Sequence, residues 1–177
     1  MTNTSKTIVF FGTEDFSVPS LQALIDSGYQ ISAVVTKPDS KQGRGQKIAP
    51  PIVKTVAQNH GITVLQPTNL LDIKDDLAKL GNSIGVLVSY GKIIPKQIID
   101  LFSPGIINVH PSLLPKYRGP SPIESVILNG DDKTGVTIMK LSEKMDAGPI
   151  YSQKEVRLDQ TETGPQLSNK LAEIGSQ

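Results

Sequence analysis

The sequence predicts an α/β domain with a doubly wound, mostly parallel sheet that helices cover on both faces. Short apolar runs alternate with segments whose apolar residues fall near helical spacing, which is typical of parallel strands joined by crossover helices. The runs are apolar throughout, as strands buried on both faces are. A length of 177 residues and an apolar content of 37% suit one domain with its own core.

The first elements can be placed from their apolar residues. The run 7–11 is apolar and ends at a glycine, which predicts a buried strand. In the segment 16–25 the apolar residues fall near helical spacing, and Gly28 follows as a stop signal, so a helix is expected there. The apolar run 31–36 predicts a second strand. The polar stretch 37–51, which is rich in proline and glycine, predicts a loop.

The same reasoning extends through the middle of the chain. We expect a helix over about 52–59 and a short strand over 62–65. A helix over 72–80 is expected to lead into a strand over 84–89, which Tyr90 and Gly91 close.

The last third contains the strand that matters most for function. A short helix around 95–101 is expected to lead into the apolar strand 106–110, and a helix over 119–128 follows. The remaining expected elements are strands over 136–141 and 150–158 and a final helix over 163–174. A sheet of this kind binds ligands beyond the carboxyl ends of its strands, where this sequence places several polar residues.

Composition excludes several classes of protein. The chain has no cysteine, which rules out a disulfide scaffold, a thiol nucleophile and a thiolate zinc site. Its two histidines, His60 and His110, are too few for a histidine-rich metal centre, so no metal site is expected. No apolar run approaches 18 residues and the first residues lack a signal-peptide core. We therefore expect a cytoplasmic monomer that does not bind membranes.

Three polar residues form a candidate catalytic set. Asn108 and His110 are two positions apart at the end of a strand, so both side chains share one face, about 7 Å apart. Asp146 lies in a turn before a later strand. An amide can donate to a developing oxyanion, an imidazole can move a proton, and a carboxylate can orient that imidazole. The alternative is structural: the pair would stabilise a turn, and Asp146 would be an ordinary turn residue.

The segments around these residues resemble a known family. Residues 108–119, NVHPSLLPKYRG, and residues 145–148, MDAG, are similar to two sequence blocks of the folate-dependent formyltransferases. The resemblance runs from about residue 7 to 174 and implies a doubly wound α/β fold. It also implies 10-formyltetrahydrofolate as co-substrate and Asn108, His110 and Asp146 as catalytic residues. Because the chain lacks a candidate nucleophile, direct transfer to an external amine fits better than a covalent intermediate.

The folate is expected against two short segments that offer backbone polar groups between apolar side chains. The residues concerned are Val88, Ser89, Tyr90, Gly91, Ser112, Leu113, Leu114 and Pro115. The alternatives are that the first segment is simply a strand ending in a turn, and that the two leucines belong to the core.

A local basic stretch points to nucleic acid, although the whole chain carries a net charge of only +1. Residues 37–54 contain five basic residues against Asp39 alone, a net charge of +4. By itself this composition fits a solvated loop. The stretch also resembles the insertion of the family branch that formylates the methionyl group of initiator tRNA. That resemblance implies that Arg44 and Lys47 contact the acceptor end of the tRNA.

Other acceptors and other roles stay open from the sequence. Formylation of an amino sugar nucleotide or of glycinamide ribonucleotide is one alternative, and release of formate to water is another. A non-catalytic folate- or tRNA-binding module left by truncation is a third. Members of the tRNA branch continue into a second, β-barrel domain. We therefore expect residues 1–177 to be the catalytic formyltransferase domain, with that barrel absent from this chain.

Overall fold

The computed structural model describes residues 6–42 and 46–177. The strands are β1 (Thr7–Gly12), β2 (Ile31–Val35), β3 (Ser40–Gln42), β4 (Lys47–Ala49), β5 (Val64–Leu65), β6 (Ser83–Val88), β7 (Ile106–His110), β8 (Lys133–Lys140) and β9 (Ile150–Arg157). The helices are α1 (Val18–Asp26), α2 (Ile52–Asn59), α3 (Lys74–Lys79), α4 (Lys96–Ile99), α5 (Pro122–Leu128) and α6 (Gly164–Ser176). Two 3₁₀ turns, Asp15–Ser17 and Leu70–Ile73, precede α1 and α3.

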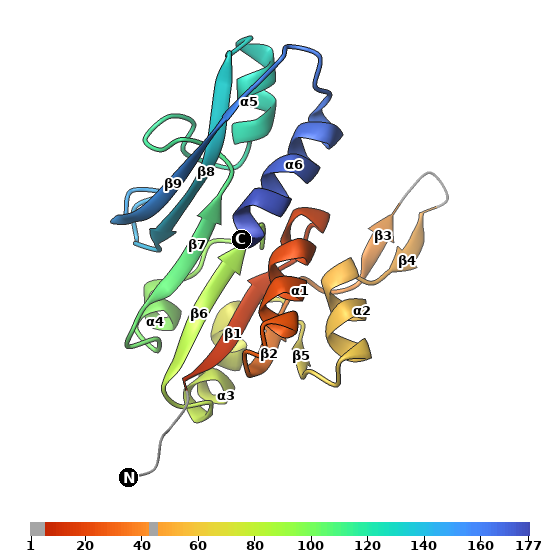
Figure 1. Cartoon of the computed structure of the whole chain (residues 1–177). Helices are drawn as coiled ribbons and strands as arrows, with labels where there is room; N and C mark the ends of the chain where they lie inside the picture. Colours follow the sequence, from red (N-terminus) through yellow and green to blue (C-terminus); the bar gives the residue numbers. More distant parts are fainter. Residues whose placement is uncertain (1–5, 43–45) are drawn as a thin grey trace.

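The large sheet has the strand order β5-β2-β1-β6-β7-β8-β9 (Figure 1). The strands from β5 to β7 are parallel, whereas β8 pairs antiparallel with both β7 and β9. The predicted doubly wound, mostly parallel sheet is therefore confirmed. The chain first builds outward from β1 through β2 and later adds β6 on the other side of β1. Because the strand order reverses there, the crevice beyond β1 and β6 is the expected ligand site.

Alternate residues of the central strands pack into two separate hydrophobic cores, one on each face of the sheet. Ile8 and Phe10 of β1 pack into a cluster with residues of α1, α2, α5 and α6. Val9 and Phe11 pack on the opposite face with residues of α3 and α4. Both faces of β1 are thus covered by helices, which explains why this strand is apolar throughout.

The prediction of a loop over 37–51 is wrong in part, because β3 and β4 form an antiparallel hairpin within this segment. Ser40 pairs with Ala49 and Lys41 pairs with Ile48. Ile48 is 72% exposed, so the hairpin buries little apolar surface. A short strand pair without a buried face leaves no alternation in the sequence from which it could be recognised.

The ends of several other elements also differ from the prediction. Helix α5 begins at Pro122 rather than at residue 119, because Gly119 has a φ of +104° that no helix accommodates. Pro122 suits the first helical turn, where its missing N–H is not needed. The elements β5, α3 and α4 are shorter than expected. Across the described part of the chain, no helix is both long and apolar enough to cross a membrane.

Candidate active site

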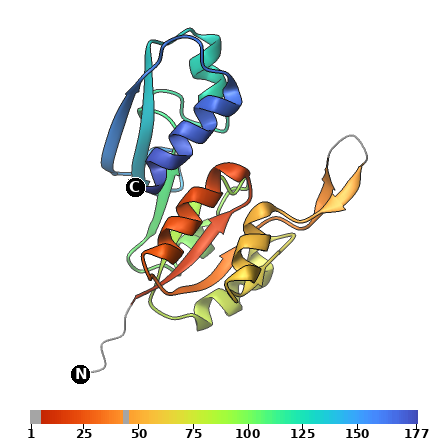
Figure 2. The same ribbon diagram turned by 45° about the vertical axis from the view of Figure 1, so that its right-hand side comes forward.

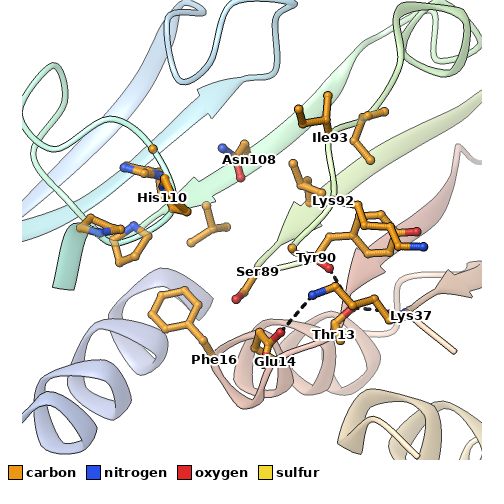
Figure 3. A pocket seen from close by; sticks show the side chains of 18 of the residues that line it. Thr13, Glu14, Phe16, Lys37, Ser89, Tyr90, Lys92, Ile93, Asn108 and His110 are labelled. Carbon is orange, nitrogen blue, oxygen red and sulfur yellow. Dashed lines mark hydrogen bonds and ion pairs between the residues drawn. The ribbon is translucent and has the colours of Figure 1, made fainter. Parts of the chain in front are cut away.

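A cleft of about 1230 Å³ opens at the carboxyl ends of β1, β2, β6 and β7. Its lining includes the segments that directly follow these strands, the loop between β8 and β9, and the start of α5. Figure 3 shows Asn108 and His110 along β7, with Thr13, Glu14 and Phe16 across the cleft beside α1. The cleft therefore occupies the position at which the strand order reverses.

Strand β7 brings Asn108 and His110 to the cleft. Both share a face with Ile106, which packs in the second core, and that face opens into the cleft as the strand ends. Asn108 is 7% and His110 5% exposed. Polar side chains with so little exposure need hydrogen-bond partners, and both find one in the loops around them.

Asp146 supplies part of that partnership from the loop between β8 and β9. Its Oδ1 accepts from Asn108 Nδ2 at 3.4 Å, and its Oδ2 lies 3.6 Å from His110 Nδ1. The same Oδ2 accepts the backbone N–H of Gly119 at 2.8 Å. The side chain is 11% exposed, and the N–H groups of Asn108 and Gly119 donate to this buried carboxylate. The structure thus brings together all three residues of the candidate catalytic set.

The side-chain hydrogen bond of His110 fixes which nitrogen can react. His110 Nε2 lies 2.9 Å from the carbonyl oxygen of Tyr117. A carbonyl can only accept, so Nε2 must carry a proton and donate it. Nδ1, facing Asp146, is then the nitrogen that can gain or lose a proton.

Three of the site residues adopt a backbone conformation that side chains disfavour. Ser89, Tyr117 and Asp146 have φ values of +46°, +57° and +45°. Such a left-handed conformation costs a non-glycine residue about 1 kcal/mol or more. Strain of this kind concentrates at functional sites, where the surrounding structure holds it in place.

The residues of the first predicted folate segment, 88–91, do not all lie in the cleft. Val88 is fully buried in the first core, whereas Ser89, Tyr90 and Gly91 line the cleft. The Tyr90 ring packs edge-on against Phe11 with centroids 6.0 Å apart. Its hydroxyl is buried with no hydrogen-bond partner among the described residues. Burial raises the pKa of Tyr90 to about 12.

The second predicted folate segment, 112–115, is not among the residues that line the cleft. It packs instead against β8 and β9. Thr137 Oγ1 donates to the Ser112 carbonyl at 2.6 Å and accepts the Leu114 N–H at 3.1 Å. Gln153 Nε2 donates to Thr137 Oγ1 and to the Leu114 carbonyl, both at 2.9 Å. This network fixes the course of the loop that follows His110.

Of the two predicted tRNA contacts, the structure describes only Lys47. Arg44 lies outside the described residues. Lys47 is exposed on β4. Lys54, from the same basic stretch, forms a 2.8 Å ion pair with Asp39 and is 19% exposed. Its charge is therefore already compensated within the protein.

Sequence reasoning missed several residues of the cleft. Lys37 Nζ lies 3.4 Å from Glu14 Oε1 and passes over Gly91, where a Cβ atom would collide with it. Glu14 and Lys37 each follow a parallel strand within two residues, which could have indicated their place. Ile93 and Met145 also line the cleft and are 80% and 58% exposed. Single exposed apolar residues of this kind leave no periodic signal.

No arrangement suited to a metal ion occurs in residues 6–42 and 46–177, where no group of three or more acidic, histidine or cysteine side chains converges. At the cleft, the carboxylate of Asp146 contacts the amide of Asn108 and the imidazole of His110. Such a set can stabilise a developing oxyanion and carry a proton.

Comparison with known proteins gives consistent results. The sequence model of the formyl transferase family matches residues 5–177. A methionyl-tRNA formyltransferase of Sulfurihydrogenibium sp. (strain YO3AOP1) is 46% identical over 172 residues, which cover 96% of this chain and 55% of the relative. One from Buchnera aphidicola subsp. Acyrthosiphon pisum (strain Tuc7) is 48% identical over 170 residues, 95% of this chain and 54% of the relative. The chain thus spans about half the length of these curated relatives.

The fold also matches solved structures. The crystal structure of phosphoribosylglycinamide formyltransferase from Bacillus halodurans aligns with a TM-score of 0.80 at 24% identity. The alignment covers 97% of this chain and 90% of that one. At this identity the likeness concerns the fold alone.

Proposed function

Since the chain belongs to the formyl transferase family, we propose that it transfers a formyl group from 10-formyltetrahydrofolate to the α-amino group of methionyl-tRNA, the initiator form. The names of the relatives at 46% and 48% identity support this choice of acceptor. We also propose that residues 1–177 form the catalytic unit.

The observation that carries the proposal is the contact among Asn108, His110 and Asp146 at the edge of a large cleft. All three line the cleft, and the Asp146 carboxylate lies 3.4 Å from Asn108 Nδ2 and 3.6 Å from His110 Nδ1. A buried amide, imidazole and carboxylate in contact suit acyl transfer to an amine, which needs an oxyanion donor and a proton carrier.

The cleft has the chemical character that a folate requires. Apolar side chains of Ile93, Leu141 and Met145 contribute to its lining, and the polar groups of Asn108 and Asp146 lie in the same cleft. Ring-shaped ligands are generally held between apolar walls with a few polar groups that fix their orientation. We propose that Ser89, Tyr90 and Gly91 are on the folate side of this cleft. The bound co-substrate supplies the activated formyl carbon.

Asn108 is placed to act on the charge that the reaction creates. When the neutral amine of the acceptor attacks the formyl carbon, a new C–N bond forms and negative charge develops on the formyl oxygen. The Asn108 Nδ2 group has two N–H bonds, and its contact with Asp146 is long, at 3.4 Å. We assign the other N–H to the formyl oxygen. A donor of this kind is typically worth 10²–10³ in rate.

His110 is placed to move the proton that the amine must lose. Nε2 is committed to the Tyr117 carbonyl, so Nδ1 accepts the proton and returns it as the bond to the folate nitrogen breaks. The Asp146 carboxylate, 3.6 Å from Nδ1, stabilises the positive charge that the ring carries in between. A free α-amino group has a pKa near 7.7–8.0, so a useful fraction is already neutral at neutral pH.

The experiment that tests the proposal compares acceptors. The purified chain is incubated with 10-formyltetrahydrofolate and either methionyl-tRNA, an amino sugar nucleotide or glycinamide ribonucleotide. Formylation of methionyl-tRNA alone is the expected result. Formylation of another acceptor instead would reassign the substrate. Folate binding with no formylated product would indicate that this chain is a non-catalytic binding module.

A further inference from the structure

The β3–β4 hairpin needs support from outside itself. Figures 1 and 2 show it extending away from the body of the domain, beyond α2. A lone two-stranded hairpin is only marginally stable in water, and Ile48 in this one is 72% exposed. The direction of the hairpin must therefore be set by contacts at its base.

Those contacts converge on Asp39, the residue directly before β3. Lys54 Nζ of α2 donates to both Asp39 carboxylate oxygens at 2.8 Å. Gln66 Nε2, directly after β5, donates to Asp39 Oδ1 at 2.7 Å and to the Lys37 carbonyl at 2.8 Å. One carboxylate thus joins the start of the hairpin to a helix and to the edge of the sheet. We call Asp39, Lys54 and Gln66 the Asp39 clamp.

The clamp differs from the ordinary surface ion pairs of this protein. Lys54 and Asp39 side chains are 19% and 34% exposed, whereas Lys79 and Asp76 in an exposed pair are 74% and 59% exposed. Solvent and salt screen the less exposed pair more weakly. The hydrogen bonds from Gln66 and Lys54 hold the pKa of Asp39 below its usual value, so the carboxylate is charged at neutral pH.

We propose that the Asp39 clamp positions the hairpin so that its exposed lysines, Lys41 and Lys47, meet the phosphates of the tRNA acceptor end. This inference rests on the proposed function, because it assumes that the hairpin contacts RNA. The clamp residues act through the hairpin and are not phosphate ligands themselves, since the charge of Lys54 is already compensated.

Replacing Asp39 gives a test in which positioning and simple charge predict opposite results. Asp39→Asn removes a negative charge from a basic stretch, so electrostatics alone would strengthen RNA binding. Positioning predicts weaker binding. The assay is fluorescence anisotropy with a stem-loop RNA that has an acceptor stem and a single-stranded 3′ end. Gln66→Leu leaves the charge unchanged and should also weaken RNA binding. We expect a loss of about two- to tenfold, because a hairpin that is no longer held must be ordered when the RNA binds.

Three control variants separate the possible failures. Asp76→Asn makes the same change in an exposed, remote pair and should leave the dissociation constant unchanged. Lys54→Arg keeps the charge and the donors and should bind RNA like the original chain. Lys47→Ala tests the hairpin contact directly and should reduce the slope of log affinity against log salt by about one.

The outcomes are distinguishable. Weaker binding in Asp39→Asn, Gln66→Leu and Lys47→Ala supports the clamp, and faster amide exchange at Lys41 and Ile48 in the first two supports it independently. Tighter binding in Asp39→Asn, with Lys47→Ala still weakened, overturns the clamp and leaves the RNA contact standing. Unchanged binding in Lys47→Ala, or no RNA binding by the original chain, overturns both the hairpin contact and the inference built on it.

Discussion

The backbone N–H of Gly119 donates to Asp146 Oδ2 at 2.8 Å and so joins the loop after β7 to the loop between β8 and β9. The same oxygen faces His110 Nδ1. One backbone hydrogen bond therefore holds the carboxylate in register with the imidazole, although the two loops are 27 residues apart in sequence.

Replacing Gly119 should break this register. Gly119→Ala places a side chain at a φ of +104°, a backbone conformation that favours glycine. The added Cβ would not collide with its surroundings, because the nearest atom, Met145 Sδ, is 3.7 Å away. Backbone strain rather than collision should therefore shift the N–H, at a cost of about 1–2 kcal/mol. We expect a modest fall in thermal stability and a much larger fall in the rate of formyl transfer. Unchanged activity would show that this hydrogen bond does not position Asp146.

Asp146 offers a substitution that removes charge while keeping shape. Asp146→Asn should keep the backbone course of the turn, because asparagine tolerates the left-handed conformation that this residue adopts. Its NH2 group does replace one of the two oxygens that accept from Asn108 and Gly119. Loss of the charge facing His110 should lower kcat by on the order of 10² or more. Circular dichroism checks the fold and single-turnover kinetics measure the loss. A near-normal kcat would remove the carboxylate from the mechanism.

Two threonines on β8 form a matched pair for stability. Thr137 makes three hydrogen bonds to the loop after β7 and to Gln153, whereas the buried Thr134 hydroxyl has no partner among the described residues. Thr137→Val leaves buried groups unsatisfied and should lower the free energy of unfolding by about 1–3 kcal/mol. Thr134→Val should leave it nearly unchanged or raise it slightly. Urea unfolding compares them, and equal effects would argue against the network.

The raised pKa of Tyr90 predicts that the protein loses stability at high pH. Its pKa is raised to about 12 by burial, against 10.0 for the ordinary group. The folded state thus keeps a proton that the unfolded state loses, so this contribution is complete below about pH 10 and falls as pH rises toward 12. Tyr90→Phe should unfold like the original chain at neutral pH, because the hydroxyl has no partner, and should lose less stability in alkali. An identical alkaline decline in both proteins would contradict the assignment.

The continuous apolar strands of this fold could be predicted from the sequence because burial on both faces demands them. β1, β6 and β7 lie within a residue or so of their expected positions. The spacing of Asn108 and His110 placed both on one face, since alternation along a strand is strictly geometric.

Other features depend on partners that leave no pattern in the sequence. The Tyr117 carbonyl that fixes the His110 tautomer and the Gly119 N–H that holds Asp146 are backbone groups, which every residue possesses. The two leucines of 112–115 were expected in the cleft, but they pack against β8 and β9, whose position relative to that loop only the fold determines. The ion pair of Lys54 with Asp39 likewise joins α2 to the residue before β3, and these two segments come together only in the folded chain.

The most direct test of the account is the single-turnover rate of formyl transfer to methionyl-tRNA by the original chain and by Asn108→Ala, measured with saturating 10-formyltetrahydrofolate. Asn108 is assigned as donor to the formyl oxygen, so the variant should bind folate normally and react on the order of 10²–10³ more slowly. A variant that folds, binds folate and reacts at the original rate would contradict the assignment of this cleft as the site of formyl transfer.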